Sequence, residues 1–207
     1  MNAEYGGFSQ TAERELEAAR ATEARVLCDI ERLGLQHNAW ELDAKGYTVL
    51  APHKAAPPEF IAELRDAIIR LSEQCHNVKA DLATGLNRTG DRMAHGAGVA
   101  TSGVLAEGRA FEQALMNERV LALITYLLGD SCRLSSMGAI LKTQGSDYLE
   151  HHVDLVGTPS PFPPYAQVAN ATWLLTDYAR ESWCTCFVDG SHLKCRPPSA
   201  AEARDFA

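Results

Sequence analysis

The chain has 207 residues, of which 46% are hydrophobic and 22% are charged, and this size and composition fit one globular domain with a sizeable core. Its formal net charge of −8 argues against nucleic acid and anionic membranes as partners. The N-terminus lacks a secretory signal pattern and the longest strongly apolar run, residues 120–128, is too short to span a bilayer, so we expect a cytoplasmic protein without membrane contact.

The first half of the sequence has the pattern of helices. Residues 11–33 are rich in Ala, Glu and Arg, and Gly34 is a suitable stop. A second helix opens at Pro58, where apolar residues begin to recur at spacings of three and four. The spacing predicts a third helix over residues 111–128 that ends at Gly129. The apolar face of the second helix comprises Phe60, Ile61, Leu64, Ile68, Leu71 and Cys75.

The second half changes from helical to strand-like patterns. Between the helices we expect a short strand at residues 46–50 and irregular structure over residues 77–108. Four later segments read as strands: residues 133–143, 148–152, 166–177 and 184–188. Helices followed by strands predict an α+β protein. A strand-rich half with long connections suits a double-stranded β-helix, the jelly-roll of cupins, with the N-terminal helices packed on it.

Two histidines and an aspartate crowd the short segment EHHVDLV, residues 150–156. In a strand, His152 and Asp154 point to the same face because they are two residues apart, while His151 points to the other face. One imidazole and one carboxylate supply two corners of the 2-His-1-carboxylate triad that holds Fe(II) with positions open for a cosubstrate and oxygen. A His-x-Asp arises by chance in about a third of such chains, so a solvent-facing or hydrogen-bonded pair is the alternative.

The residues around this motif resemble the phytanoyl-CoA dioxygenase family of Fe(II)/2-oxoglutarate-dependent oxygenases. In that family a His-x-Asp is followed by a Pro-rich loop, a strand that ends in a Leu-Thr-Asp-like stretch, a Glu-Asn-Gly turn and a Pro-Gly-Ser-His turn. The similar parts of this sequence are residues 152–154, 159–164, 175–177, 181–183 and 189–192. The resemblance spans about residues 40–200 and is most specific over the second half of that range.

The resemblance implies both a reaction and a set of site residues. His152 and Asp154 would be iron ligands, and Trp173 falls where some members place an aromatic side chain next to 2-oxoglutarate, with a core position as its alternative. His192 falls in the Pro-Gly-Ser-His turn, where it is a conformational or substrate-side residue. The implied cofactors are Fe(II) and 2-oxoglutarate, and the implied reaction is hydroxylation of an unactivated C–H bond of a small organic or acyl substrate by O₂.

Two expected residues are not found after the motif. In the family a distal His lies well beyond the Pro-Gly-Ser-His turn, and a later Arg binds 2-oxoglutarate. No histidine follows His192 in this sequence, and the only later arginines are Arg196 and Arg204. We therefore expect residues 1–39 to form a helical arm and residues 40–207 a partial domain without its closing strands, from a truncated or degenerate oxygenase. The alternative is a catalytically incomplete fragment or binding module without iron chemistry. In a further alternative, His192 itself serves as the distal iron ligand.

A second group of metal-binding residue types lies near the C-terminus. Cys184, Cys186, His192 and Cys195 could form a zinc site, although their spacing matches no common finger or ribbon. Cys184 and Cys186 also fit one face of a buried strand, since cysteine is among the most buried residue types. We expect all six cysteines of this chain to be reduced thiols.

Overall fold

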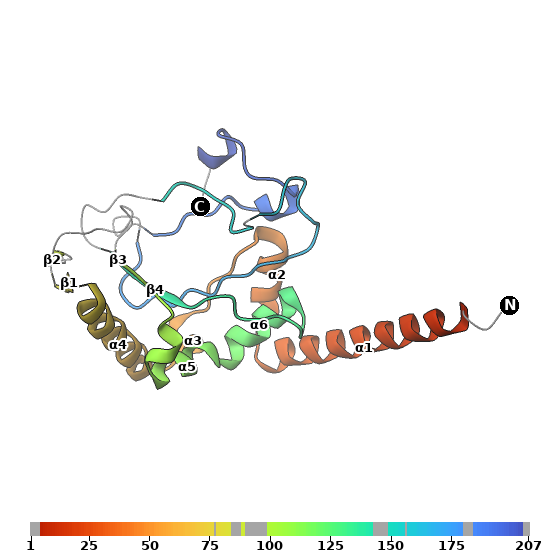
Figure 1. Cartoon of the computed structure of the whole chain (residues 1–207), viewed down its shortest axis with the longest axis horizontal. Helices are drawn as coiled ribbons and strands as arrows, with labels where there is room; N and C mark the ends of the chain where they lie inside the picture. Colours follow the sequence, from red (N-terminus) through yellow and green to blue (C-terminus); the bar gives the residue numbers. More distant parts are fainter. Residues whose placement is uncertain are drawn as a thin grey trace.

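The computed structural model describes residues 5–76, 78–83, 88–89, 99–142, 149–155, 157–179 and 184–204 (Figure 1). The α-helices are α1 (Tyr5–Arg32), α2 (Gln36–Lys45), α3 (Pro52–Ala55), α4 (Pro58–His76), α5 (Arg109–Leu115) and α6 (Glu118–Leu128). The strands are β1 (Val78–Lys79), β2 (Arg88–Thr89), β3 (Val99–Ser102) and β4 (Gly138–Leu141). Three 3₁₀ turns complete the set: η1 (Val104–Glu107), η3 (Ser191–Lys194) and η4 (Glu202–Arg204). The chain is therefore α+β, as the sequence predicted.

The described strands form two antiparallel pairs, β1 with β2 and β3 with β4. In the second pair, Val99 lies opposite Leu141 and Ser102 lies opposite Gly138. A Cβ atom at Gly138 would lie 3.1 Å from the Thr101 carbonyl oxygen, so the small residue allows the two strands to approach. The sequence prediction of a strand within residues 133–143 is confirmed for β4, whereas β1, β2 and β3 lie in residues 77–108, which were predicted to be irregular.

Several predicted strands are coil in the structure. Four predictions of strands were wrong, because the segments are coil in the structure. They are residues 46–50, 166–177, 184–188 and the described part of 148–152. The burial nevertheless alternates at every second residue over 172–176 and 184–190, as in a strand lying on a core. These segments have the side-chain pattern of strands, while strand assignment requires backbone pairing with a neighbour.

The core has two parts. The first joins α4, η1, α5 and β4, and its fully buried residues include Leu64, Val104 and Phe111. The second joins α1, α2 and α6 through Val26, Ile30, Leu35, Ala39, Leu42 and Leu123. The periodic apolar faces read from the sequence therefore meet as helix-on-helix contacts, and burial of each large aliphatic side chain stabilises the fold by about 1.5–3 kcal/mol.

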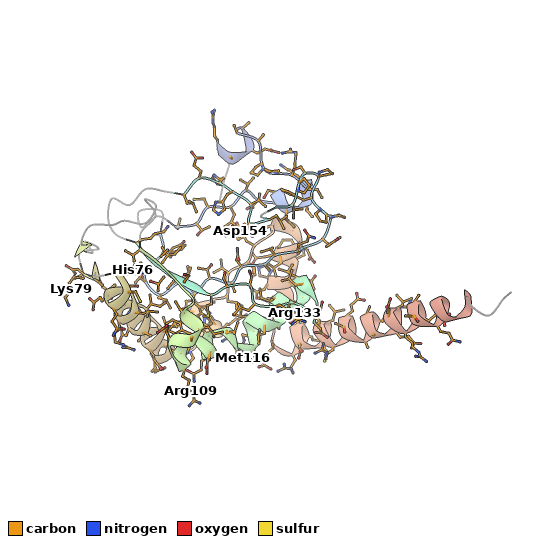
Figure 2. All side chains as sticks on the ribbon, viewed as in Figure 1. His76, Lys79, Arg109, Met116, Arg133 and Asp154 are labelled. Carbon is orange, nitrogen blue, oxygen red and sulfur yellow. The ribbon has the colours of Figure 1, made fainter. Side chains whose placement is uncertain are left out.

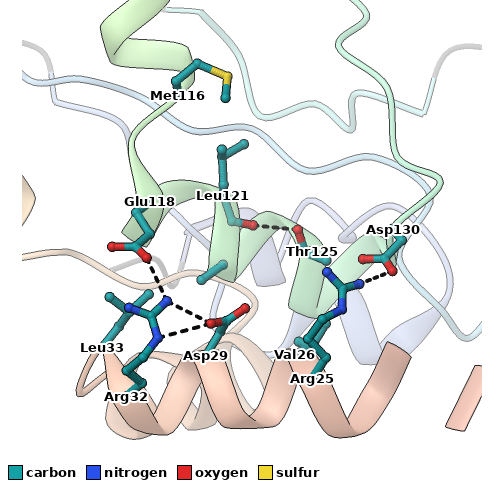
Figure 3. Close-up of a pocket in the computed structure, with 11 residues that line it drawn as sticks. Arg25, Val26, Asp29, Arg32, Leu33, Met116, Glu118, Leu121, Thr125 and Asp130 are labelled. Carbon is teal, nitrogen blue, oxygen red and sulfur yellow. Dashed lines mark hydrogen bonds and ion pairs between the residues drawn. The ribbon is translucent and has the colours of Figure 1, made fainter. Parts of the chain in front are cut away.

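The N-terminal helix packs on the rest of the chain through its C-terminal half only. Helix α1 is 28 residues long and its N-terminal half projects away from the other elements (Figure 1). No helix of the described ranges is both long and apolar enough to cross a membrane. Ion pairs flank the contact between α1 and α6 (Figure 3): Arg25 pairs with Asp130, and the Arg32 guanidinium lies 2.6 Å from Glu118. Because these pairs are exposed, they orient the helices while the buried Val26 and Ile30 supply most of the stability.

The predicted helix over residues 111–128 is two helices, separated at Asn117. The Asn117 side-chain oxygen accepts a hydrogen bond from the Val120 N–H at 3.2 Å, which caps the N-terminus of α6. Its amide nitrogen donates to the Ala55 carbonyl at 2.9 Å. The apolar periodicity continues across this break, which is why periodicity alone predicted one helix.

The C-terminal coil is docked on the end of α2 at Gly46. Gly46 has φ +89°, and a Cβ atom there would lie 2.6 Å from His192 Nδ1. The other side of the same ring, Nε2, donates to the Asp43 carbonyl at 3.1 Å. The Gly190 N–H donates to the Lys45 carbonyl at 2.9 Å, so η3 sits directly on the α2 C-terminus.

Aromatic contacts extend this docking beyond Gly46. The rings of Tyr47 and Phe187 stack with centroids 4.4 Å apart. Burial, together with a hydrogen bond to Asp189, raises the pKa of Tyr47 above its ordinary value. The C-terminal coil is thus held to the helical half by both backbone and side-chain contacts.

Replacement of Asn117 tests the cap that separates α5 from α6. We expect Asn117→Ala to lower the free energy of unfolding by about 1 kcal/mol, because the α6 N-terminus loses its acceptor. Asn117→Asp keeps that acceptor and loses only the donor to Ala55, so it should be less damaging. Urea unfolding followed by circular dichroism measures both, and equal losses for the two variants would contradict the capping role.

Replacement of Gly46 tests the docking of the C-terminal coil. Gly34 also has a positive φ, +67°, but no atom lies within 4 Å of a Cβ built there, so Gly34→Ala measures the backbone penalty alone. That penalty is about 1–2 kcal/mol. Gly46→Ala should cost about 1 kcal/mol more, because the new methyl group displaces His192 from its hydrogen bond.

The same experiment has an internal control. In a His192→Ala background the two alanine substitutions should cost the same, since the ring is no longer there to be displaced. Thermal unfolding measures the four variants, and an unchanged difference between Gly46→Ala and Gly34→Ala in that background would rule out the contact.

Candidate metal centre

His152 and Asp154 lie close together in the coil of residues 149–155. The His152 Nε2 atom is 3.3 Å from Asp154 Oδ1, and the two side chains are 54% and 51% exposed. The expectation that they share the inward face of a strand is wrong, because the segment is coil and both residues are exposed. The two groups still lie close together, and each makes a second hydrogen bond on its other side.

Two hydrogen bonds orient the pair. The Glu150 carbonyl oxygen lies 2.8 Å from His152 Nδ1. A carbonyl can only accept, so Nδ1 carries a proton, which leaves Nε2 as the ring nitrogen that could bind a metal ion. On the other side, the Asn170 amide nitrogen donates to Asp154 Oδ2 at 2.5 Å, which leaves Oδ1 facing the imidazole. Figure 2 shows Asp154 among the coil segments of the C-terminal half.

The chemistry and spacing of the pair fit two ligands of one metal ion. A nitrogen and an oxygen bound at about 2.0–2.2 Å in neighbouring positions of an octahedral ion lie about 3 Å apart. The observed 3.3 Å is close to that separation. A carbonyl that holds the imidazole tautomer and an amide that holds the carboxylate are the outer contacts that metal ligands ordinarily have. Imidazole and carboxylate are ligand types that Fe(II) accepts, so the donor chemistry of His152 and Asp154 is compatible with that ion.

The structure does not bring His192 to this pair. Among the described residues no group of three or more His, Cys, Asp or Glu side chains could hold a metal ion. His192 is instead engaged with Asp43 and Gly46, so the alternative in which it serves as the distal ligand is not supported by its position. The predicted zinc group of Cys184, Cys186, His192 and Cys195 is likewise not assembled in the described part of the chain, and each of the six cysteines is a thiol.

Trp173 lies against the helical core. Its ring meets Phe60 of α4 edge to face, with centroids 5.6 Å apart, and Leu175 packs against the same core cluster. This is the core placement that the sequence left open as an alternative. The proposed cofactor contact of Trp173 stays a prediction.

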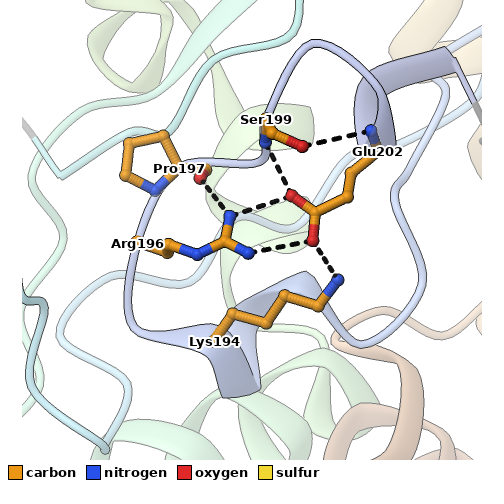
Figure 4. A network of polar contacts seen from close by, with 5 residues as sticks. All are labelled: Lys194, Arg196, Pro197, Ser199 and Glu202. Atoms are coloured by element: carbon orange, nitrogen blue, oxygen red, sulfur yellow. Dashed lines mark hydrogen bonds and ion pairs between the residues drawn. The ribbon is translucent and has the colours of Figure 1, made fainter.

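Arg196 is fully engaged by a carboxylate (Figure 4). Its two terminal nitrogens donate to the two oxygens of Glu202 at 2.8 and 3.0 Å. Lys194 and the Ser199 N–H donate to the same carboxylate, at 2.6 and 2.7 Å. The Arg196 guanidinium, with Lys194 and Ser199, holds the pKa of Glu202 well below its ordinary value. Arg196 therefore closes the C-terminal turn, and to bind 2-oxoglutarate it would first have to leave Glu202.

Reasoning from the sequence missed Asn170 and the Glu150 carbonyl. Asn170 is 16 residues from Asp154 and beyond the Pro-rich segment, so no spacing rule connects the two. Glu150 contributes a backbone atom, which no residue pattern reveals. The predicted turn element at residues 181–183 lies outside the described residues.

Comparison with known proteins gives one family. The family model described as phytanoyl-CoA dioxygenase (PhyH) matches residues 42–207, which include His152, Asp154, Asn170 and Trp173. Neither the curated proteins nor the solved structures that were compared with the chain give a match.

The pairing of Arg196 with Glu202 predicts a pH response of this turn. Because the folded pKa of Glu202 is lowered from 4.5, the pair stabilises the fold above pH 4.5, and this contribution is lost as the pH falls toward the folded value. In Arg196→Leu the Glu202 pKa should rise toward 4.5, as measured by carboxyl ¹³C NMR titration. Arg204→Leu is the control and should leave the pKa of Glu202 lowered. An unchanged Glu202 pKa in Arg196→Leu would show that the pair does not form in solution.

Proposed function

The chain belongs to the phytanoyl-CoA dioxygenase family, and from this premise we propose that it is a non-haem Fe(II)/2-oxoglutarate-dependent oxygenase. It hydroxylates an unactivated C–H bond of a small organic or acyl substrate. The observation that carries the proposal is the His152–Asp154 pair, whose nitrogen and oxygen lie 3.3 Å apart with an outer hydrogen bond on each side. Fe(II) and 2-oxoglutarate, when bound, would supply the oxidising power with O₂, so that substrate, 2-oxoglutarate and O₂ would give hydroxylated product, succinate and CO₂.

The protein side chains hold the metal and limit its geometry. His152 would donate Nε2 and Asp154 would donate Oδ1, while Glu150 keeps the imidazole proton on Nδ1. Both side chains are about half exposed, so bound substrate or cosubstrate has to cover them to exclude water. We propose Trp173 as a wall for 2-oxoglutarate, supported by its place at the edge of the core beside Phe60.

We propose residues 40–207 as the catalytic domain, with a double-stranded β-helix core of the cupin type, and residues 1–39 as a helical arm. The match over residues 42–207 supports the domain limits. The strand-like alternation of burial over 172–176 and 184–190 supports the proposed core, because inner and outer faces alternate along the strands of such a barrel.

A binding module without iron chemistry is the second candidate. Two contacts favour it. His192, the alternative for the distal iron ligand, is bonded to Asp43, and Arg196, a possible partner of 2-oxoglutarate, is paired with Glu202. In that case the His152–Asp154 pair is a surface hydrogen bond, and the chain would take up no Fe(II) and form no succinate.

Turnover of 2-oxoglutarate separates the two candidates. We expect the purified chain, supplied with Fe(II), ascorbate and O₂, to convert 2-oxoglutarate to succinate. His152→Ala and Asp154→Ala should each reduce succinate formation to the level of the protein-free reaction, because each removes a metal ligand. The measurement is succinate by mass spectrometry.

The neighbouring His151 provides the matched control. His151→Ala changes the same residue type one position away and should keep succinate formation within about twofold of the parent chain, a change worth only a few tenths of a kcal/mol in barrier. Equal loss in His151→Ala and His152→Ala would contradict the assignment. A parent chain without succinate formation or Fe(II) uptake would establish the binding module in its place.

A further inference from the structure

The Oδ2 atom of Asp154 is bonded to a side chain that is distant in the sequence, whereas the Nδ1 atom of His152 is bonded to a backbone carbonyl two residues away. The Asn170 amide nitrogen donates to Oδ2 at 2.5 Å, while Oδ1 of the same carboxylate faces His152 Nε2 at 3.3 Å. The two oxygens of Asp154 thus have different partners on opposite sides of the group. We infer that Asn170 is a positioning residue that presents Oδ1 of Asp154 to the metal, an inference that rests on the proposed function.

The physical need for such a residue follows from the freedom of an exposed carboxylate. The terminal torsion of an aspartate is broad, so an unrestrained carboxylate rotates and offers either oxygen. With half of its side chain exposed, Asp154 has little packing to stop that rotation. A donor fixed on Oδ2 would limit the carboxylate to offering Oδ1 to a metal ion.

The hydrogen bond from Asn170 to Asp154 depends on how the segment of Asn170 packs on the core. Three residues later Trp173 packs on Phe60, and the same extended segment continues to Leu175 at the core cluster. The bond therefore ties the mobile torsion of Asp154 to a segment that is anchored on α4. The Glu150 carbonyl performs the corresponding task for His152 from within its own segment.

Metal affinity tests the inference without any turnover. Mn(II) is a redox-stable divalent ion with the same preference for oxygen and nitrogen ligands, and its free form is measured by electron paramagnetic resonance. Loss of an outer-shell partner weakens metal binding by about 10–100-fold, and we expect Asn170→Ala to fall near the lower limit because the site is open to water. Asn170→Gln keeps an amide donor and should recover part of the lost affinity.

Gln167→Ala is the matched control. It removes an exposed amide from the same segment, three residues before Asn170, and should leave the Mn(II) affinity unchanged. Circular dichroism and the melting temperature of each variant report whether the fold is kept. If Asn170 only fastens the coil, Asn170→Ala lowers the melting temperature and leaves the affinity unchanged, which overturns the inference.

The result for the parent chain separates this inference from the proposed function. If the parent chain binds Mn(II) and His152→Ala weakens it while Asn170→Ala does not, the metal site stands and the role of Asn170 is refuted. If the parent chain and His152→Ala bind Mn(II) equally weakly, the proposed function fails and the inference fails with it. Both are supported if Gln167→Ala keeps the Mn(II) affinity of the parent chain, Asn170→Gln loses part of it and Asn170→Ala loses more.

Discussion

The docking of η3 on the end of α2 is the constraint on which the C-terminal half depends. Within residues 149–204 the described backbone makes no ladder with another strand, so its position rests on contacts with the helices. Gly46 makes one of these contacts possible, because its positive φ and missing side chain leave room for the His192 ring. The Gly190 bond to Lys45 and the stacking of Tyr47 on Phe187 fix the same junction.

This arrangement has consequences for the candidate site. His192 belongs to a family-like turn, and in this structure that turn fastens the coil to the helices and does not reach His152 and Asp154. His152 and Asp154 are oriented locally, by a backbone carbonyl and by Asn170. The site is thus built on coil that is anchored at two places, Gly46 and Trp173, and its geometry depends on a few hydrogen bonds that compete with water.

The sequence predicted α1, α4 and the region of α5 and α6 because their signals are local, but it missed the shorter helices α2 and α3. Periodic apolar residues and stop residues such as Gly34 and Gly129 act within a few turns of the chain, and the helix at Pro58 was read correctly for the same reason. Strands need a partner, so the prediction of a strand around Trp173 from the alternation of its own residues was wrong: the segment is coil. In the site, the spacing of two predicted that His152 and Asp154 would lie together, although on a strand where the structure has coil, and Asn170 could not be foreseen because tertiary packing alone brings it there.

The central claim is that His152 and Asp154 bind one ferrous ion together. A crystal structure of the chain grown without oxygen in the presence of Fe(II), with the iron located by its anomalous scattering, tests this directly. The account predicts iron within about 2.0–2.2 Å of both His152 Nε2 and an Asp154 oxygen. Iron bound at a different group of residues, with the imidazole and carboxylate of this pair still hydrogen-bonded to each other, would contradict it.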